Sequence, residues 1–230
     1  MKITIDIETI GSDDPEIRES IAANIKPPGN YKKAESIETW LTEEKPALVD
    51  EAVARTGLDG ATGQIICIGY AFDDEPAAAT CTNNERALLI DFFDKIETRR
   101  KMPKNHMRAP LFIGHNIAGF DLKFILKRCV INGIRPPFCI PFKAKPWDDV
   151  IFDTMAQWDA LNRISLDNLC RTLGIASSKG DMDGSKVWDA YRANERQRIA
   201  DYCCRDVEAA RAIYQRMTFS EEPFPMSVAA

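Results

Sequence analysis

Residues 2–9 read Lys-Ile-Thr-Ile-Asp-Ile-Glu-Thr, with the period of two that is typical of a β-strand. The three isoleucines fall on one face, which we expect to pack into the core. Asp6 and Glu8 share the other face, where the rise per residue of a strand places them about 6.5–7 Å apart. These carboxylates repel each other, and a cation beside them would relieve the repulsion. An amphipathic edge strand with its acids in water is the alternative, so a metal site requires further carboxylates from elsewhere.

The composition is that of a globular protein. The chain has 230 residues, 45% of them hydrophobic and 28% charged, which is enough for one sizeable core. No apolar run is long enough to cross a bilayer, and the first residues enter a strand instead of a signal segment. The seven cysteines form no C-x-x-C pair and have only two histidines as co-ligands, which argues against a zinc site or a disulfide framework. We therefore expect a cytoplasmic protein with no membrane partner.

The net charge of −5 is concentrated in one segment. Residues 11–60 contain eleven acids and six bases, whereas the rest of the chain is neutral as a whole. If several of the remaining acids form a metal site, the other surface of the main domain is mildly basic, as a nucleic-acid partner requires. Residues 99–108 include six basic side chains. We expect an exposed loop there, with contact to phosphates as the alternative.

A helical insertion is expected after the first strand. Residues 11–63 interrupt the strand pattern and contain three helix-like stretches, at about residues 15–25, 34–44 and 46–56. We expect one domain over residues 1–220 that this insertion interrupts, with a C-terminal tail at 221–230. The insertion is expected to be a decoration that covers apolar surface, and a lid, a substrate guide and a docking site for a protein partner are alternatives. Its acidic balance indicates that it avoids the nucleic-acid path or binds a basic partner.

The rest of the chain alternates strands and helices. We expect strands at residues 65–72, 77–82, 111–114 and 149–154, and helices at about 83–97, 121–131, 165–175 and 194–217. The strands at 65–72 and 77–82 form a hairpin. Asp121 falls in the first turn of a helix directly after a strand, where open α/β sheets place their chemistry. Its alternative role is a favourable interaction with the helix dipole.

The last helix carries an acid within its apolar stripe. Asp206 lies four residues after Tyr202 and three after Cys203, both on the face that the spacing of the apolar residues predicts to be buried. A buried carboxylate is costly unless a metal or a fixed hydrogen-bond network compensates it. Asp206 is therefore a stronger functional candidate than a surface acid. Tyr202 taken alone would be a core aromatic residue.

Three short motifs occur in a fixed order: Asp6-x-Glu8-Thr9, Asn116-x-x-x-Phe120-Asp121 and Tyr202-x-x-x-Asp206. The ordered set resembles the DEDD superfamily (DnaQ-like) of 3′ to 5′ exonucleases, whose motifs are D-x-E, N-x-x-x-(F/Y)-D and a final helix with the fourth acid.

The tyrosine subclass (DEDDy) is implied, because the histidine subclass has a histidine where this chain has Asp201. Residues 114–116, 179–187 and 202–207 look similar to stand-alone exonucleases related to the proofreading domain of family B DNA polymerases. The resemblance covers residues 1–10 and about 64–217 and leaves the insertion unexplained.

The resemblance implies an α/β, RNase H-like fold, with a mixed sheet whose first three strands are antiparallel and whose later strands are parallel, and with helices on both faces. It also implies that Asp6, Glu8, Asp121 and Asp206 hold two divalent ions. Mg²⁺ or Mn²⁺ is favoured because all the ligands are hard oxygens. Two such ions about 3.5–4 Å apart clamp the attacking and the leaving oxygen of an in-line phosphoryl displacement. Tyr202 would orient the attacking water.

Other residues take roles by the same likeness. Thr9 would lie against the terminal nucleotide, Asn116 would contact the substrate backbone, and Phe120 would belong to the substrate-binding residues. His115 is expected to be structural, since the tyrosine subclass does not require it.

The implied activity is hydrolysis of phosphodiester bonds at the 3′ end of DNA, single-stranded or frayed, with release of nucleoside 5′-monophosphates. An exoribonuclease with the same site is an alternative, because no residue identifies discrimination of the 2′-OH. A second alternative is a catalytically inactive RNase H-like module that binds nucleic acid or a partner. The presence of all four acids and the tyrosine argues against it.

Overall fold

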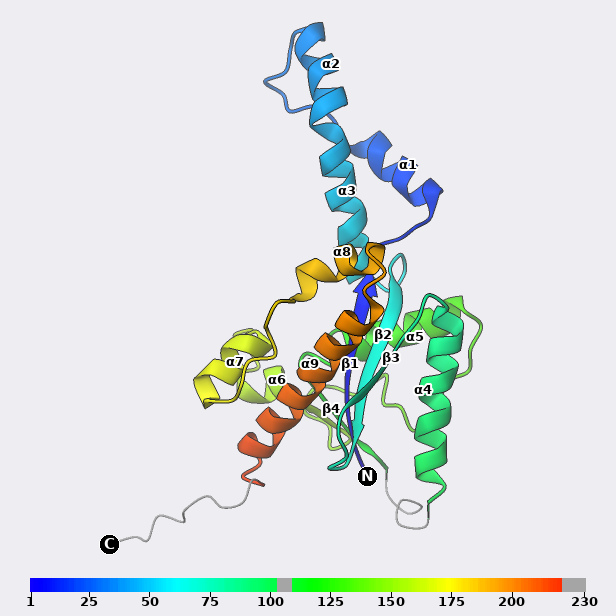
Figure 1. Ribbon diagram of the computed structural model, residues 1–230, viewed down its shortest axis with the longest axis vertical. Helices are drawn as coiled ribbons and strands as arrows, with labels where there is room; N and C mark the ends of the chain where they lie inside the picture. The colour runs from blue at the N-terminus through cyan, green and yellow to red at the C-terminus, as the bar shows by residue number, and fades with distance from the viewer. Residues whose placement is uncertain (103–108, 221–230) are drawn as a thin grey trace, which may run out of the picture.

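The computed structural model describes residues 1–102 and 109–220. Part of the basic stretch, residues 103–108, and the expected tail, residues 221–230, lie outside the described residues. Within the described residues, five strands form one sheet in the order β3-β2-β1-β4-β5 (Figure 1). They are β1 (Lys2–Ile10), β2 (Gln64–Phe72), β3 (Ala78–Cys81), β4 (Leu111–Gly114) and β5 (Ile151–Asp153).

The strand directions are those that the resemblance implies. β1 and β3 each pair with β2 in antiparallel register, whereas β1, β4 and β5 run parallel. The mixed sheet is therefore confirmed. The last strand is shorter than expected, because Thr154 begins a helix and Asp153 caps it by accepting from the backbone N–H groups of Met155 and Ala156.

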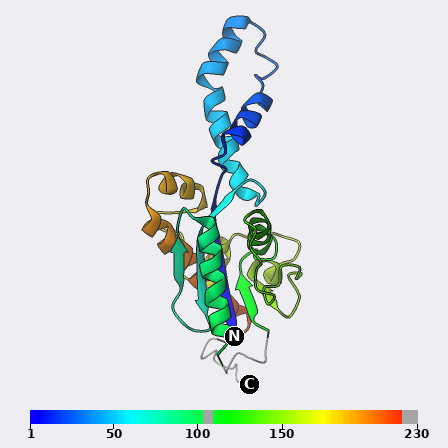
Figure 2. The ribbon, with the colours of Figure 1, turned by 90° about the vertical axis from the view of Figure 1, so that its right-hand side faces the viewer.

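Helices cover both faces of the sheet (Figures 1 and 2). α4 (Glu85–Arg100) and α5 (Asp121–Ile131) pack on one face, and α9 (Arg196–Met217) crosses the other. The shorter helices are α6 (Thr154–Trp158), α7 (Leu166–Leu173) and α8 (Val187–Arg192). Among the residues that the structure describes, no helix has both the length and the apolar character that a membrane span requires.

β1 lies in the middle of the sheet, so the edge-strand alternative for its acids is wrong. Its three isoleucines are buried against α4 and α5, which leaves Asp6 and Glu8 on the face that α9 covers. The ladder with β2 shifts by one residue after Glu8, since Glu8 faces Cys67 and Thr9 faces Ile65. The extra residue is a β-bulge, which bends a strand and increases its twist. It falls directly beside the second acid of the first motif.

α9 lies unusually close to β2. A Cβ atom added at Gly69 would come within 2.7 Å of Cys203 Sγ, so the glycine allows the helix to rest almost on the strand backbone. The buried face of α9 contains Tyr202, Cys203 and Asp206, as the apolar spacing predicts. This contact sets the height of the helix above the two acids of β1.

The insertion forms a projecting arm, by which we mean residues 11–63. Its helices are α1 (Pro15–Asn24), α2 (Ala34–Glu43) and α3 (Lys45–Arg55), followed by a 3-10 helix, Thr56–Leu58. Figures 1 and 2 show the arm standing clear of the sheet, beyond the C-terminal end of β1. Trp40, Val49 and Val53 are buried within it. The three expected helices are confirmed, and they pack on one another.

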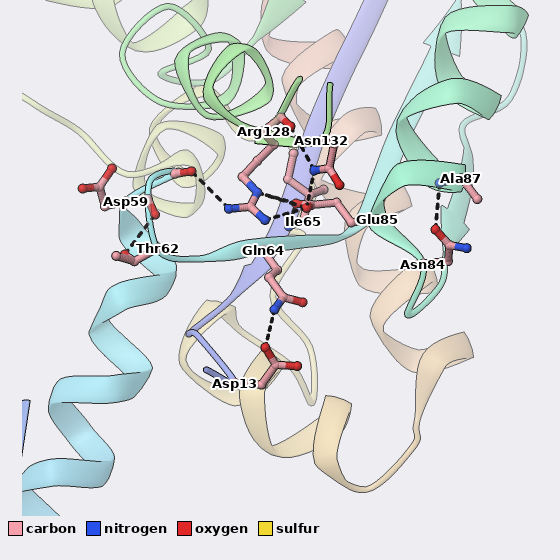
Figure 3. Close-up of polar contacts among 11 residues, drawn as sticks. Asp13, Asp59, Thr62, Gln64, Ile65, Asn84, Glu85, Ala87, Arg128 and Asn132 are labelled. Carbon is pink, nitrogen blue, oxygen red and sulfur yellow. Dashed lines mark hydrogen bonds and ion pairs between the residues drawn. The ribbon is translucent and has the colours of Figure 1, made fainter. Parts of the chain in front are cut away.

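A buried ion pair joins the base of the arm to the sheet and to two helices (Figure 3). Arg128 of α5 donates from Nε and Nη2 to the carboxylate of Glu85, at the start of α4, over 2.7–3.0 Å. Glu85 also accepts from the backbone N–H of Ile65 at 2.7 Å and from Asn132 Nδ2 at 2.8 Å. Arg128 Nη1 reaches the carbonyl of Gly60 at 3.4 Å. The pair thus ties the end of the arm to β2, α4 and α5.

We expect Arg128→Ala to lower the free energy of unfolding by about 3 kcal/mol, because it leaves the Glu85 carboxylate buried without its counter-ion. Urea denaturation measures the loss. The control is the neighbouring Lys127→Ala, which removes an exposed ion pair with Asp59 and should cost less than about 1 kcal/mol. Equal losses in the two variants would contradict the role given to the buried pair.

Candidate active site

The structure brings the four predicted acids together from three elements. Asp6 and Glu8 come from β1, Asp121 is the first residue of α5, and Asp206 comes from α9. Asp121 is held against β1, where its Oδ1 accepts the backbone N–H of Ile7 at 3.1 Å. Glu8, Asp121 and Asp206 are buried. Residues up to 200 positions apart in the chain therefore form one carboxylate cluster.

Burial and mutual repulsion make the cluster hard to ionise fully. Burial is the main cause that raises the pKa of Asp6 and of Glu8 well above the usual range, and the neighbouring carboxylates add to it. Burial also raises the pKa of Asp121 to about 7, although the N–H of Ile7 opposes the shift. A bound cation would remove the repulsion and favour the charged forms.

Asp206 has an unsatisfied oxygen. Burial raises the pKa of its carboxyl group, and the hydroxyls of Ser178 and Tyr202 oppose that rise. Within the described part of the chain, Asp206 Oδ1 is one of two buried side-chain N or O atoms that have no hydrogen-bond partner. An orphaned buried carboxylate oxygen is costly, and a metal ion is a partner that would satisfy it.

The donor set fits a divalent cation. One ligand atom each from Asp6, Glu8 and Cys203 lie within 4.8 Å of one another. The carboxylates are hard oxygen donors, which suit Mg²⁺ or Mn²⁺. Cys203 is a neighbour that the sequence did not indicate as part of the site; its Sγ lies 3.5 Å from Asp6 Oδ2. The apolar stripe had placed Cys203 on the buried face, but not against an acid.

A pocket of about 490 Å³ lies beside the cluster, and we call it the site pocket. Glu8, Thr9 and Phe120 line it, so two of the three expected substrate-binding residues face this space. The Thr9 hydroxyl is already engaged, because Oγ1 donates to the carbonyl of Gly57 at 2.7 Å. The other walls come from the arm, from Gly184 and Ser185 in the turn that precedes α8, and from Trp188 of α8.

Asn116, the third expected substrate-binding residue, is not among the described residues that line the site pocket. It has a left-handed backbone with φ 59°, and its side-chain oxygen lies over Gly119, where a Cβ atom would meet it at 2.3 Å. Its backbone N–H donates to Asp153 Oδ1 at 2.9 Å, and that of Ala118 donates to Oδ2 at 3.1 Å. In this structure Asn116 shapes the turn that leads to Asp121.

Asp153 and His115 attach the turn at Asn116 to neighbouring elements. Asp153 is buried at the end of β5 and uses its carboxylate on backbone N–H groups, so it is not a free ligand despite lying near the cluster. The sequence placed it in a strand and assigned it no role. The two ring nitrogens of His115 contact Thr154 Oγ1 and the carbonyl of Ile164, each at 2.9 Å. These contacts agree with the structural role expected for His115.

The polar loop before α8 supplies residues that the sequence did not single out. Ser178 is buried beside Asp206, and the charges of Arg205 and Lys179 oppose the rise that burial causes in the pKa of that acid. Arg205 holds the loop in place by donating from Nε to the carbonyl of Ser178 at 3.0 Å. Residues 179–187 had entered the family resemblance as a whole, and the position of Lys179 in that stretch was the available signal.

The class of protein follows from comparison with known sequences. Residues 77–226, more than half of the chain, match the family described as "Predicted 3'-5' exonuclease related to the exonuclease domain of PolB". The chain therefore belongs to this family. The match includes Asp121, Tyr202 and Asp206 and begins after the first motif.

Two individual proteins are also similar to this chain. "Putative DNA polymerase 060R" of Frog virus 3 (isolate Goorha) is 22% identical over an alignment of 177 residues, and the match covers 65% of this chain and 16% of the viral protein. The family B DNA polymerase of the hyperthermophilic archaeon Pyrobaculum calidifontis matches 94% of this chain and 24% of its own with a TM-score of 0.58 and 12% identity. The chain thus spans less than a quarter of either polymerase. The DnaQ-like resemblance and the RNase H-like fold are confirmed.

We expect the metal-free protein to lose stability as the pH rises from about 5 to about 8. A carboxyl group whose pKa is raised in the folded state stabilises it most below the unfolded pKa near 4, and that contribution is lost as the pH passes the folded pKa, about 7 for Asp121. Asp206→Asn removes one repelling charge. It should gain about 1–3 kcal/mol over the wild type at about pH 8 and flatten the pH dependence.

Urea denaturation in EDTA at the two pH values tests this expectation. The control is Asp94→Asn, which neutralises an exposed acid of α4. An unchanged pH dependence in Asp206→Asn would show that the carboxylates do not destabilise one another.

Proposed function

We propose that this protein is a 3′ to 5′ exonuclease that hydrolyses DNA from its 3′ end with two divalent metal ions. The observation that carries the proposal is the convergence of four carboxylates and Tyr202, from β1, α5 and α9, beside the site pocket. We also propose that residues 1–220 act as one exonuclease domain that the arm interrupts, and that residues 221–230 are a tail.

Asp6, Glu8, Asp121 and Asp206 would hold the ions. When bound, two Mg²⁺ or Mn²⁺ ions supply positive charge that activates water and stabilises the leaving oxygen. The acids alone repel a phosphodiester, so the same residues that build the site prevent activity without metal. The orphaned Oδ1 of Asp206 and the raised pKa values of Asp6 and Glu8 support a site built for cations.

Tyr202 is proposed to orient the attacking water. Burial and the adjacent Asp206 raise the pKa of its hydroxyl, which therefore stays protonated and able to donate a hydrogen bond. The water oxygen bonds to phosphorus as the bond from phosphorus to the 3′ oxygen breaks. The water gives up a proton, the 3′ oxygen gains one, and a nucleoside 5′-monophosphate leaves.

Lys179 is proposed to add a positive charge on the α9 side of the cluster. It is exposed and acts on Asp206 electrostatically. An ammonium group there would attract the terminal phosphate and offset the negative cluster. The loop of residues 177–185 thus completes the site from outside the strands.

DNA is proposed as the substrate because both named relatives are DNA polymerases. Single-stranded or frayed ends fit a site in which the acids are buried beneath a pocket, since a terminal base must leave its stack to enter. A cytoplasmic location is proposed from the cysteines, all seven of which are free thiols.

The direct test is a time course on a single-stranded DNA oligonucleotide labelled at its 5′ end, with Mg²⁺ or Mn²⁺. We expect a ladder that shortens from the 3′ end and stops in EDTA. Asp206→Ala should lower the rate by at least about 10³-fold, as removal of one member of a catalytic unit does. Asp94→Ala is the control.

Degradation of a matched RNA but not of DNA would show that the substrate is RNA and would leave the proposed reaction unchanged. Wild-type protein that leaves both intact while it binds them would favour the inactive binding module.

We expect Lys179→Ala to lower kcat about tenfold or more, because the transition state loses a nearby positive charge. The control is Lys186→Ala, in the same loop, whose ammonium group donates to the carbonyl of Asp181 and pairs with Asp183. Equal rates for the two variants in the oligonucleotide assay would remove Lys179 from the proposed site.

A further inference from the structure

The base of the arm, by which we mean residues 11–13 and 51–63, packs onto the strand that carries the acids. A Cβ atom at Gly11 would lie 2.2 Å from the carbonyl oxygen of Val53, and one at Gly57 would lie 2.8 Å from the backbone of Ile10. Such distances mean that the two segments of the chain touch backbone to backbone. The Thr9 hydroxyl adds its bond to Gly57.

Further polar contacts close this junction. The backbone N–H of Ser12 donates to Thr56 Oγ1 at 2.8 Å. Gln64 Nε2 donates to Asp13 Oδ1 at 2.6 Å, which joins the start of the arm to the strand that follows it (Figure 3). The same region is bound to α5 through Arg128. The arm base is therefore fixed relative to Glu8 and Asp121.

The arm base also forms part of the site pocket. Glu51, Ala54, Arg55, Gly57 and Leu58 line it from the arm. Opposite them stand Glu8 and Thr9 of β1, Phe120 before α5, and Ser185 and Trp188 near α8. The space of about 490 Å³ lies within the range of sites for small ligands and is bordered by both a carboxylate of the cluster and the arm.

The chemistry of this lining suits a nucleotide. Leu58 is 71% exposed although it is apolar, and with Phe120 and Trp188 it offers surface for a base. Arg55 is the basic side chain that the arm presents to the pocket, and its side chain is 72% exposed. Arginine binds phosphate through paired hydrogen bonds.

Arg55 forms a weak, exposed ion pair within the arm. Its guanidinium bonds to Glu51 Oε1 at 2.6 Å, one turn away on α3, and both side chains are more than half exposed. Exposed pairs of this kind contribute little to stability, so a phosphate can replace the carboxylate at small cost.

We infer that the arm base is one wall of the substrate site and that Arg55 binds a backbone phosphate near the 3′ end of the nucleic acid. This inference rests on the proposed nuclease function and assigns the insertion a direct part in it. The rest of the arm is acidic and repels phosphates, so the nucleic acid contacts the base of the arm and not its outer part.

The test compares Arg55→Ala with Arg18→Ala in the oligonucleotide assay. Arg18 is the matched control, because it also lies on the arm and pairs with an acid of α3, Asp50, but does not line the site pocket. We expect Arg55→Ala to raise KM about tenfold with little change in kcat, as loss of a contact made equally in the ground and transition states does. Arg18→Ala should match the wild type.

Two further readouts separate a phosphate contact from a structural effect. The slope of log KM against log salt should become shallower by about 0.7 in Arg55→Ala, as expected for one phosphate contact to a single strand. Glu51→Gln, which frees the guanidinium, should lower KM. Equal KM values and salt slopes for Arg55→Ala and Arg18→Ala would overturn the inference while leaving the nuclease proposal intact.

If the wild type hydrolyses neither DNA nor RNA, the proposed function fails. Fluorescence anisotropy of a labelled single strand in EDTA then decides the inference by itself. Weaker binding by Arg55→Ala than by Arg18→Ala would support the inference that the arm base is a wall of the substrate site. Equal binding by the two variants would exclude it.

Discussion

Repulsion among four carboxylates in one small buried volume is the constraint around which this protein is arranged. A pair of acids two residues apart on a surface strand would cost little. Here β1 lies between β2 and β4, α9 covers its acidic face, and Asp121 is drawn in by the N–H of Ile7. The surrounding packing, including the contact of α9 with Gly69, keeps these charges together against their tendency to separate. Such opposition is usual where a structure is adapted to a ligand instead of to its own stability.

Much of the architecture could be predicted because its signals are local. The alternation of β1, the apolar stripe of α9 and the position of Asp121 at a helix start each depend on a few neighbouring residues. The order of the motifs then indicated the family and the strand directions. The acids at positions 6, 8, 121 and 206 were found in this way, and the structure places them in one cluster.

The remaining parts depend on contacts that no local pattern records. Cys203 was recognisable as buried, but its proximity to Asp6 is set by the height of α9 above β2. Asn116 belongs to the second motif, yet its backbone is held by Asp153, which lies at the end of β5. The arm was predicted as helices, whereas its place beside Glu8 follows from backbone packing at glycines 11 and 57.

The arm leaves the sheet at Ile10 and returns at Gln64, and these two residues are paired neighbours in the ladder between β1 and β2. In topological terms the arm is a long hairpin loop on two adjacent strands. Insertions at such a loop leave the remaining strand order unaltered and add little closure entropy as they lengthen. The outer part of the arm can therefore diverge in length and sequence among related proteins while the acids stay in place. Evolution can modify what such a protein recognises separately from the reaction it performs.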